Sequence, residues 1–279
     1  MRTIPDSMDP VVVRAVDARL DGVEEEHGVR IVWAIESGSR AWGFPSPDSD
    51  YDCRFLYVRP VGDYLGLRAR RDVIETPLDK VFDVNGWDMR KAFGLMVRGN
   101  ATVGEWLRSP IVYRGDAALR DELVRLAEDV VDRHALARHY LHVARNNLAL
   151  LASSGVAKKF FYALRPAVTL RWMRLHDHAA LPPMDLPTLV AQAAVPDDVR
   201  AGVEKLVTRK ARTRELGSMV VPDVLTAFVE QELRSAEANL PGPRRAPGPG
   251  QDPSAQAAGR THAWALADDA FRRLVGGPH

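Results

Sequence analysis

The clearest chemical signal in this sequence is a Gly-Ser pair followed by two aspartates. Gly38 and Ser39 end one strand-like run of residues. Asp50 and Asp52 open the next such run. Side chains alternate across a strand, so a spacing of two predicts that these carboxylates lie side by side on one face. Two close carboxylates repel each other unless a cation lies between them, and Mg²⁺, with Mn²⁺ as the alternative, suits such an oxygen site.

The Gly-Ser pair predicts a place for phosphate beside that cation. Gly38 leaves backbone N–H groups bare and Ser39 adds a hydroxyl, and both can hold phosphate oxygens. Carboxylates that bind a metal beside a phosphate site are the parts that phosphoryl or nucleotidyl transfer needs. Each part alone has an ordinary alternative, because Gly-Ser is a common tight turn and Asp-Ser-Asp is common turn or capping chemistry. Their combination between two predicted strands favours the site.

A known family shares this pattern. The stretch GSRAWGFPSPDSDYDCRFLYVR, which begins at Gly38, resembles the signature of the DNA polymerase β-type nucleotidyltransferase superfamily. It is similar to one branch, the predicted nucleotidyltransferases that include the RNA-ligase-associated type. The later stretch DVNGWDMRKAFGLMVRGNATVGEWLRSPIVY resembles the same branch, so the resemblance covers residues 31–113 and extends more loosely to about residue 235. Two positions depart from the pattern, Ala101 after Asn100 and Cys53 after the second aspartate, and neither is a predicted metal ligand.

The resemblance implies a Mg²⁺-dependent enzyme that moves a nucleoside monophosphate from an NTP to an acceptor hydroxyl. It implies that Asp50, Asp52 and a third carboxylate are catalytic and hold the metal, and that Gly38, Ser39 and Arg40 contact the nucleotide. An RNA end is a candidate acceptor. Two alternatives stay open: a non-catalytic module that binds a nucleotide or a partner, and a transferase that modifies a protein or a small molecule, of the toxin–antitoxin or antibiotic-modifying type.

Two residues compete for the role of third carboxylate. Asp83 lies within the apolar run VFDVNGW, whereas Asp88 precedes the helical segment MRKAF. Capping that helix would explain Asp88 completely. Asp83 has no such local explanation, so we predict Asp83 as the third ligand and keep Asp88 as the alternative.

A later helix offers a second set of residues for the nucleotide. Lys158, Tyr162 and Arg165 are spaced so that they share one helix face, and Pro166 is expected to kink or break that helix. A lysine and an arginine could grip a triphosphate, and the tyrosine between them could stack on a base. A solvated helix face is the alternative.

Periodicity predicts an α+β chain: a polymerase-β-like nucleotidyltransferase sheet with flanking helices, followed by an all-helical domain. The domains expected are a catalytic domain at 1–113, a helical domain at 114–240 that completes the nucleotide cleft, a flexible Pro/Gly linker at 241–260 and a C-terminal helix at 261–279. Residues 110–116 are predicted to be a turn between the two halves. The predicted strands are 29–37, 51–59, 72–76 and 79–87, and the predicted helices are 10–26 (capped by Asp9), 88–98, 101–108, 116–132, 134–153, 156–177, 197–212, 222–239 and 261–275.

Composition sets the outer limits. A net charge of +1 excludes a scaffold that binds nucleic acid through bulk positive charge, although a local basic cleft remains compatible with it. Cys53 is the single cysteine, so the chain has no disulfide partner within itself. With no long apolar stretch and no apolar core in the N-terminal segment, we expect a cytoplasmic protein without a membrane partner. The C-terminal helix is expected to dock on the helical half or on a second chain, where it is a candidate oligomer contact.

Overall fold

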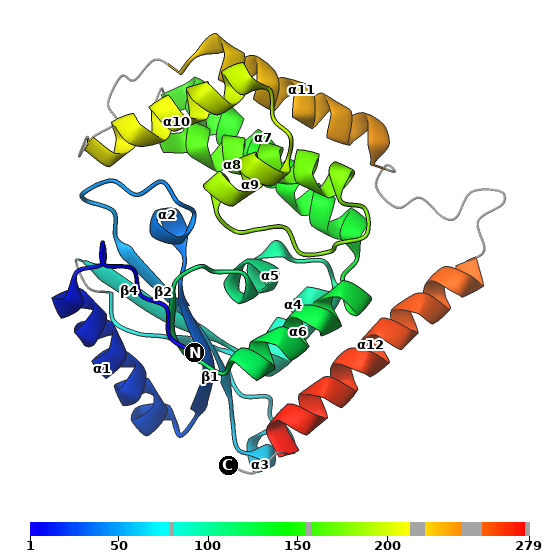
Figure 1. Ribbon diagram of the computed structural model, residues 1–279. Coiled ribbons are helices and arrows are strands. Elements are labelled where there is room, and N and C mark those ends of the chain that lie inside the picture. The colour runs from blue at the N-terminus through cyan, green and yellow to red at the C-terminus, as the bar shows by residue number, and fades with distance from the viewer. Residues whose placement is uncertain (79–80, 155–157, 213–220, 241–252, 277–279) are drawn as a thin grey trace.

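The structure is a computed structural model with a mixed five-stranded sheet at its centre (Figure 1). It describes residues 1–78, 81–154, 158–212, 221–240 and 253–276, with the backbone alone for 152–154, 158 and 253–257. The strands are β1 Arg30–Glu36, β2 Tyr51–Val58, β3 Val73–Glu75, β4 Phe82–Asp88 and β5 Val112–Gly115. Their order is β3-β4-β2-β1-β5, in which β2 and β4 run parallel and the other neighbours antiparallel. A helical region follows the sheet along the chain, so the predicted α+β class is confirmed.

Helices cover both faces of the sheet. α1 (Pro10–His27) lies on one face, and α4 (Met89–Val97), α5 (Ala101–Leu107) and α6 (Ala117–Val130) lie on the other (Figure 1). Alternation along β2 serves both layers: Phe55 packs in the core on the α1 side, whereas Leu56 packs with α4 and α6.

Short-range signals set where the helices begin. Asp9 caps α1, as predicted, because its Oδ1 accepts a hydrogen bond of 2.7 Å from the N–H of Val11. Pro10 takes the first helical position, where no N–H is needed. Asp88 caps α4 in the same way, with Oδ1 2.8 Å from the N–H of Arg90. The capping alternative for Asp88 is therefore confirmed.

The remaining helices, apart from the C-terminal one, form a second body above the sheet (Figure 1). They are α7 Arg133–Ser154, α8 Lys158–Leu175, α9 Leu186–Gln192, α10 Asp197–Arg212 and α11 Asp223–Asn239. Their shared core includes Phe44, which comes from the loop before β2 and stacks on Phe161 of α8 with ring centroids 4.8 Å apart. The loop at 42–50, called the motif loop below, therefore joins the helical body to the sheet.

Local patterns misjudged several segments. Residues 110–116 are not only a turn, because β5 pairs with β1 there and forms an edge of the sheet. α8 continues through Pro166 instead of breaking. The short helices α2 (Gly38–Ala41), α3 (Val61–Tyr64) and α9 lacked enough periodicity to be predicted.

The C-terminal helix is longer than predicted and packs elsewhere. α12 spans Pro253–Gly276, so residues 253–260 of the predicted linker are helical, and 241–252 lie outside the described residues. It packs against α4 and α6 instead of the helical body. Phe271 makes edge contacts with Tyr64 and Phe93, with ring centroids 5.1 and 5.9 Å away. Its apolar side is thus covered by its own chain, and a role in oligomer formation stays a prediction.

Candidate functional site

A polar patch occupies one end of an otherwise apolar sheet face. Asp52 and Arg54 of β2 lie beside Asp83 and Asn85 of β4, because the parallel register pairs Asp52 with Asp83 and Arg54 with Asn85. Further along β2 this face turns apolar with Leu56. Asp52 and Asp83, called the carboxylate pair below, keep 30% and 26% of their side chains exposed, so the patch opens to solvent.

The carboxylate pair converges on a cation, and in this structure the cation is an arginine. Nη2 of Arg54 lies 3.2 Å from Oδ1 of Asp52 and 2.9 Å from Oδ2 of Asp83. Hard carboxylate oxygens of this kind are ligands that Mg²⁺ and Mn²⁺ prefer, so two of the three predicted carboxylates fit a divalent ion. Across the described ranges, no three His, Cys, Asp or Glu side chains gather closely enough to hold a metal. The structure therefore supplies a two-carboxylate site and not the complete predicted set.

Asp50 lies outside the strand that was expected to carry it. β2 begins at Tyr51, and the exposed Asp50 ends the motif loop. The prediction that the first two aspartates share a strand face is wrong for this reason. The loop is held by Arg40, which donates to the carbonyls of Ser49 (2.6 Å) and Asp50 (3.1 Å) and lies 3.8 Å from the centre of the Tyr51 ring.

Gly38 lets the backbone approach Asp52 closely. Its φ is +60°, and a Cβ built there would lie 2.0 Å from Oδ2 of Asp52. Any other residue would push the carboxylate away. Ser39 is only 8% exposed, and its hydroxyl donates to Oγ of Ser49 at 2.9 Å. The Ser39 side chain thus holds the motif loop, and contact with phosphate remains a prediction.

Glu36, which the sequence analysis did not single out, supports the start of β2 from below. Its side chain is completely buried, with Oε1 accepting from the N–H of Asp52 (2.8 Å) and Oε2 from the hydroxyl of Tyr113 (2.7 Å). Burial raises the pKa of Glu36 from 4.5 to about 7, although both hydrogen bonds act to lower it. A glutamate at the end of an apolar strand was the available signal.

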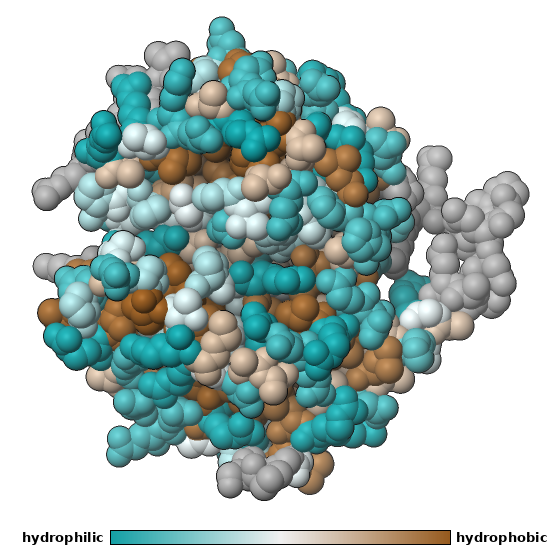
Figure 2. All heavy atoms as spheres, viewed as in Figure 1, coloured by the Kyte–Doolittle hydropathy of each residue, from teal (hydrophilic) through white to brown (hydrophobic). Residues whose placement is uncertain are grey.

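The helical body faces the aspartates through Tyr162. Burial raises the pKa of the Tyr162 hydroxyl, and the negative charges of Asp52 and Asp50 raise it further. The Tyr162 ring makes an edge contact with Trp42 of the motif loop at 5.5 Å. The space-filling view shows a notch at its left edge, between the helical body above and the sheet part below (Figure 2). Tyr162 is therefore brought to the carboxylate patch, as predicted.

Arg165 does not reach toward the patch as a free cation. Its side chain is 7% exposed and forms an ion pair of 2.8 Å with Glu105 of α5. The guanidinium also lies 4.5 Å from the centre of the Trp42 ring. The prediction of a nucleotide contact is contradicted by this burial, because helical spacing does not show what a neighbouring helix places opposite. The side chain of Lys158, the third member of that predicted face, lies outside the described residues.

Asp88 lies far along β4 from the patch. Besides capping α4, its carboxylate accepts a hydrogen bond of 3.0 Å from Tyr64 and pairs with Arg59 at 3.6 Å. Burial raises its pKa. Of the two candidates for third carboxylate, Asp83 is the one beside Asp52. Its role as a metal ligand stays a prediction.

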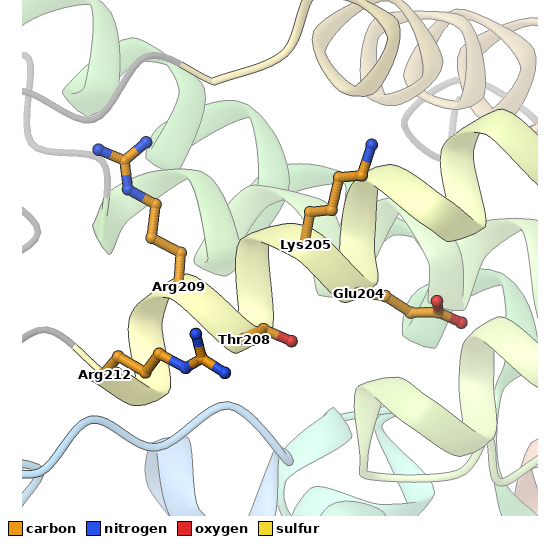
Figure 3. A pocket seen from close by; sticks show the side chains of 5 residues that line it. All are labelled: Glu204, Lys205, Thr208, Arg209 and Arg212. Atoms are coloured by element: carbon orange, nitrogen blue, oxygen red, sulfur yellow. The ribbon is translucent and has the colours of Figure 1, made fainter.

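An open pocket of about 480 Å³ lies on the C-terminal half of α10. It is lined by Glu204, Lys205, Thr208, Arg209 and Arg212, and is called the basic pocket below (Figure 3). The close-up shows the chain of the motif loop region passing beneath Arg212 (Figure 3). The buried Lys210 ties this part of α10 to that loop, since its ammonium lies 4.6 Å from the centre of the Phe44 ring.

Comparison with known proteins identifies the class that this fold and patch represent. A mixed sheet with a Gly-Ser turn and a carboxylate pair is the arrangement of a nucleotidyltransferase of the polymerase β type. The chain belongs to the RNA repair pathway DNA polymerase β family, whose model matches residues 12–254. Family membership supports nucleotidyl transfer as the general activity. Within the described ranges, no helix has the length and apolar character needed to cross a membrane.

Two individual proteins show the range of similarity. The uncharacterized protein YcgL of Bacillus subtilis (strain 168) is 39% identical over 222 residues, which cover 79% of this chain and 84% of that protein. A crystal structure of a nucleotidyltransferase-like protein from Exiguobacterium sibiricum 255-15 aligns with 93% of this chain and 91% of its own, at 12% identity and a TM-score of 0.32. At that TM-score the second likeness does not define the fold.

Proposed function

We propose that the protein is a Mg²⁺-dependent nucleotidyltransferase that moves a nucleoside monophosphate from an NTP to the hydroxyl of an RNA end. The observation that carries the proposal is the convergence of the Asp52 and Asp83 carboxylates on one cation position beside Gly38. Asp50 is the third proposed ligand, supplied by the motif loop. A bound Mg²⁺ would neutralise the triphosphate and lower the pKa of the attacking hydroxyl.

The chain's own residues supply binding and orientation. Gly38 presents backbone to the phosphates at a point where no Cβ intervenes. Tyr162, which faces the aspartates from α8, is proposed to contact the nucleotide base. Glu36 holds the N–H of Asp52 and so orients the strand that carries the carboxylate. Positioning of this kind supplies a large part of the rate in phosphoryl transfer chemistry.

Two observations favour RNA as the acceptor. The family is described by its place in RNA repair. In addition, the basic pocket places Lys205 and Arg212 on a helix that contacts the motif loop. Cations beside a transfer site suit a strand of phosphodiesters, because each phosphate carries a negative charge.

The test is transfer of label from NTPs in the presence of Mg²⁺ to RNA, protein or small-molecule acceptors. We expect labelled RNA, and we expect Asp52→Asn and Asp83→Asn to lose the transfer while folding normally. Asp88→Ala is the matched control, which should keep the transfer and lose about 0.5–2 kcal/mol of stability with the cap. Label on protein or on a small molecule would replace the acceptor, and nucleotide binding without transfer to any acceptor would support a binding module instead.

A further inference from the structure

Arg54 holds the two carboxylate oxygens that a bound ion would need. Asp83 has its Oδ1 engaged with Nδ2 of Asn85 at 2.7 Å, and Asp52 has its Oδ2 against the backbone of Gly38. The oxygens that converge are therefore Oδ1 of Asp52 and Oδ2 of Asp83. Both contact the same nitrogen of Arg54.

The arginine is anchored at this position by the main chain. Its Nη1 donates to the carbonyl oxygens of Cys53 (2.9 Å) and Asp83 (3.1 Å), which leaves Nη2 aimed at the carboxylate pair. Only 20% of the Arg54 side chain is exposed, so water screens the interaction weakly. A guanidinium held on two backbone oxygens and two carboxylates is a built part of the site.

We propose that Arg54 is a resident cation of the carboxylate pair and that it sets the affinity of the pair for divalent ions by competing for these two oxygens. The inference rests on the proposed function, because it requires a divalent ion at the same pair. With Arg54 present the three side chains carry a net charge of −1, and without it −2. The guanidinium therefore opposes the ion twice, by occupying its ligands and by repelling its charge.

The experiment is titration of the full-length protein with Mn²⁺ alone, with free Mn²⁺ measured by its electron paramagnetic resonance signal. We expect Arg54→Gln to bind Mn²⁺ at least about tenfold more tightly than the wild type, because an ion no longer displaces charge-assisted hydrogen bonds. Arg54→Lys keeps one charge, loses the forked contact to the backbone carbonyls, and should fall between the two. It also protects the test if Arg54→Gln folds poorly.

Arg114→Gln is the matched control. Arg114 also bridges two carboxylates from a strand of the same sheet, with Nη2 2.7 Å from Asp21 and Nη1 3.2 Å from Glu24, but it lies away from the carboxylate pair. This variant should bind Mn²⁺ as the wild type does. Asp52→Asn in the Arg54→Gln background should remove the added affinity and so assign it to the pair.

Two results would overturn the inference, and they differ in what else they reach. Equal or weaker Mn²⁺ binding in Arg54→Gln and Arg54→Lys, with binding that Asp52→Asn abolishes, would refute the competition and leave the metal site of the proposed function intact. No Mn²⁺ binding at the pair in any variant would refute both.

Discussion

Replacing Gly38 by alanine tests the close approach that forms the site. A Cβ at this position would lie 2.0 Å from Oδ2 and 3.0 Å from Cγ of Asp52, whereas ordinary contacts begin near 3.4 Å. The carboxylate must therefore move by more than about 1 Å, and a misplacement of that size costs on the order of 10²-fold in rate. We expect Gly38→Ala to lose nucleotidyl transfer by about that factor.

The same substitution also strains the backbone, and a control separates the two effects. A non-glycine residue at a left-handed φ costs about 1–2 kcal/mol, and Gly38 has a φ of +60°. Gly28 has a φ of +58° with nothing within 4 Å of its Cβ position. Gly28→Ala should therefore lose about 1–2 kcal/mol of stability and keep full transfer activity.

The assay pairs urea unfolding with the rate of label transfer from NTP for the wild type and both variants. Gly38→Ala should be destabilised at least as much as Gly28→Ala and should alone lose activity. If the two variants transfer nucleotides equally fast, the contact between Gly38 and Asp52 has no part in catalysis and the reasoning fails.

Three further predictions concern stability and binding. Burial raises the pKa of Glu36 to about 7 from 4.5, so wild-type stability should fall by about 3 kcal/mol as pH rises through that interval, and Glu36→Gln, which mimics the protonated form, should lose this slope in urea unfolding at pH 5 and 8; parallel pH profiles would contradict it. Arg165→Ala should cost about 3–5 kcal/mol, because it leaves Glu105 buried and without its cation, whereas Arg234→Ala, which breaks an exposed pair with Glu230, should cost less than about 1 kcal/mol; similar melting temperatures would refute the structural role. Reversing the charges of Lys205 and Arg212 should weaken single-stranded RNA binding and reduce the salt slope of the binding constant by roughly 1.4, while reversal of the exposed Arg14 and Arg68 should not; equal slopes in anisotropy titrations would place the RNA elsewhere.

The position of Arg54 shows how near the sequence came to the site. Strand alternation already placed Asp52 and Arg54 on one polar face, since Cys53 and Phe55 between and beyond them are apolar. The pairing of β2 with β4 then brings Asp83 to the same level. Register between strands separated by about thirty residues depends on packing over both faces, and no local pattern contains it.

Arg165 shows the opposite case, in which a correct helix gave a wrong role. The helix and its spacing were predicted, and Tyr162 does face the aspartates. Whether a cation on that face meets solvent depends on the partner across the interface, which is Glu105 from α5. α12 is similar, because its apolar side was evident and the surface that covers it was not.

The sequence by itself determined the features that short-range chemistry dictates. The cap at Asp9, the strands and the Gly-Ser and Asp-x-Asp pattern follow from side-chain alternation, hydrogen bonding within one turn and the freedom of glycine. Only the tertiary structure decided which charges meet. It paired Arg54 with Asp52 and Asp83, because burial and strand register place groups from distant segments within a few ångströms, where charge and desolvation decide their roles.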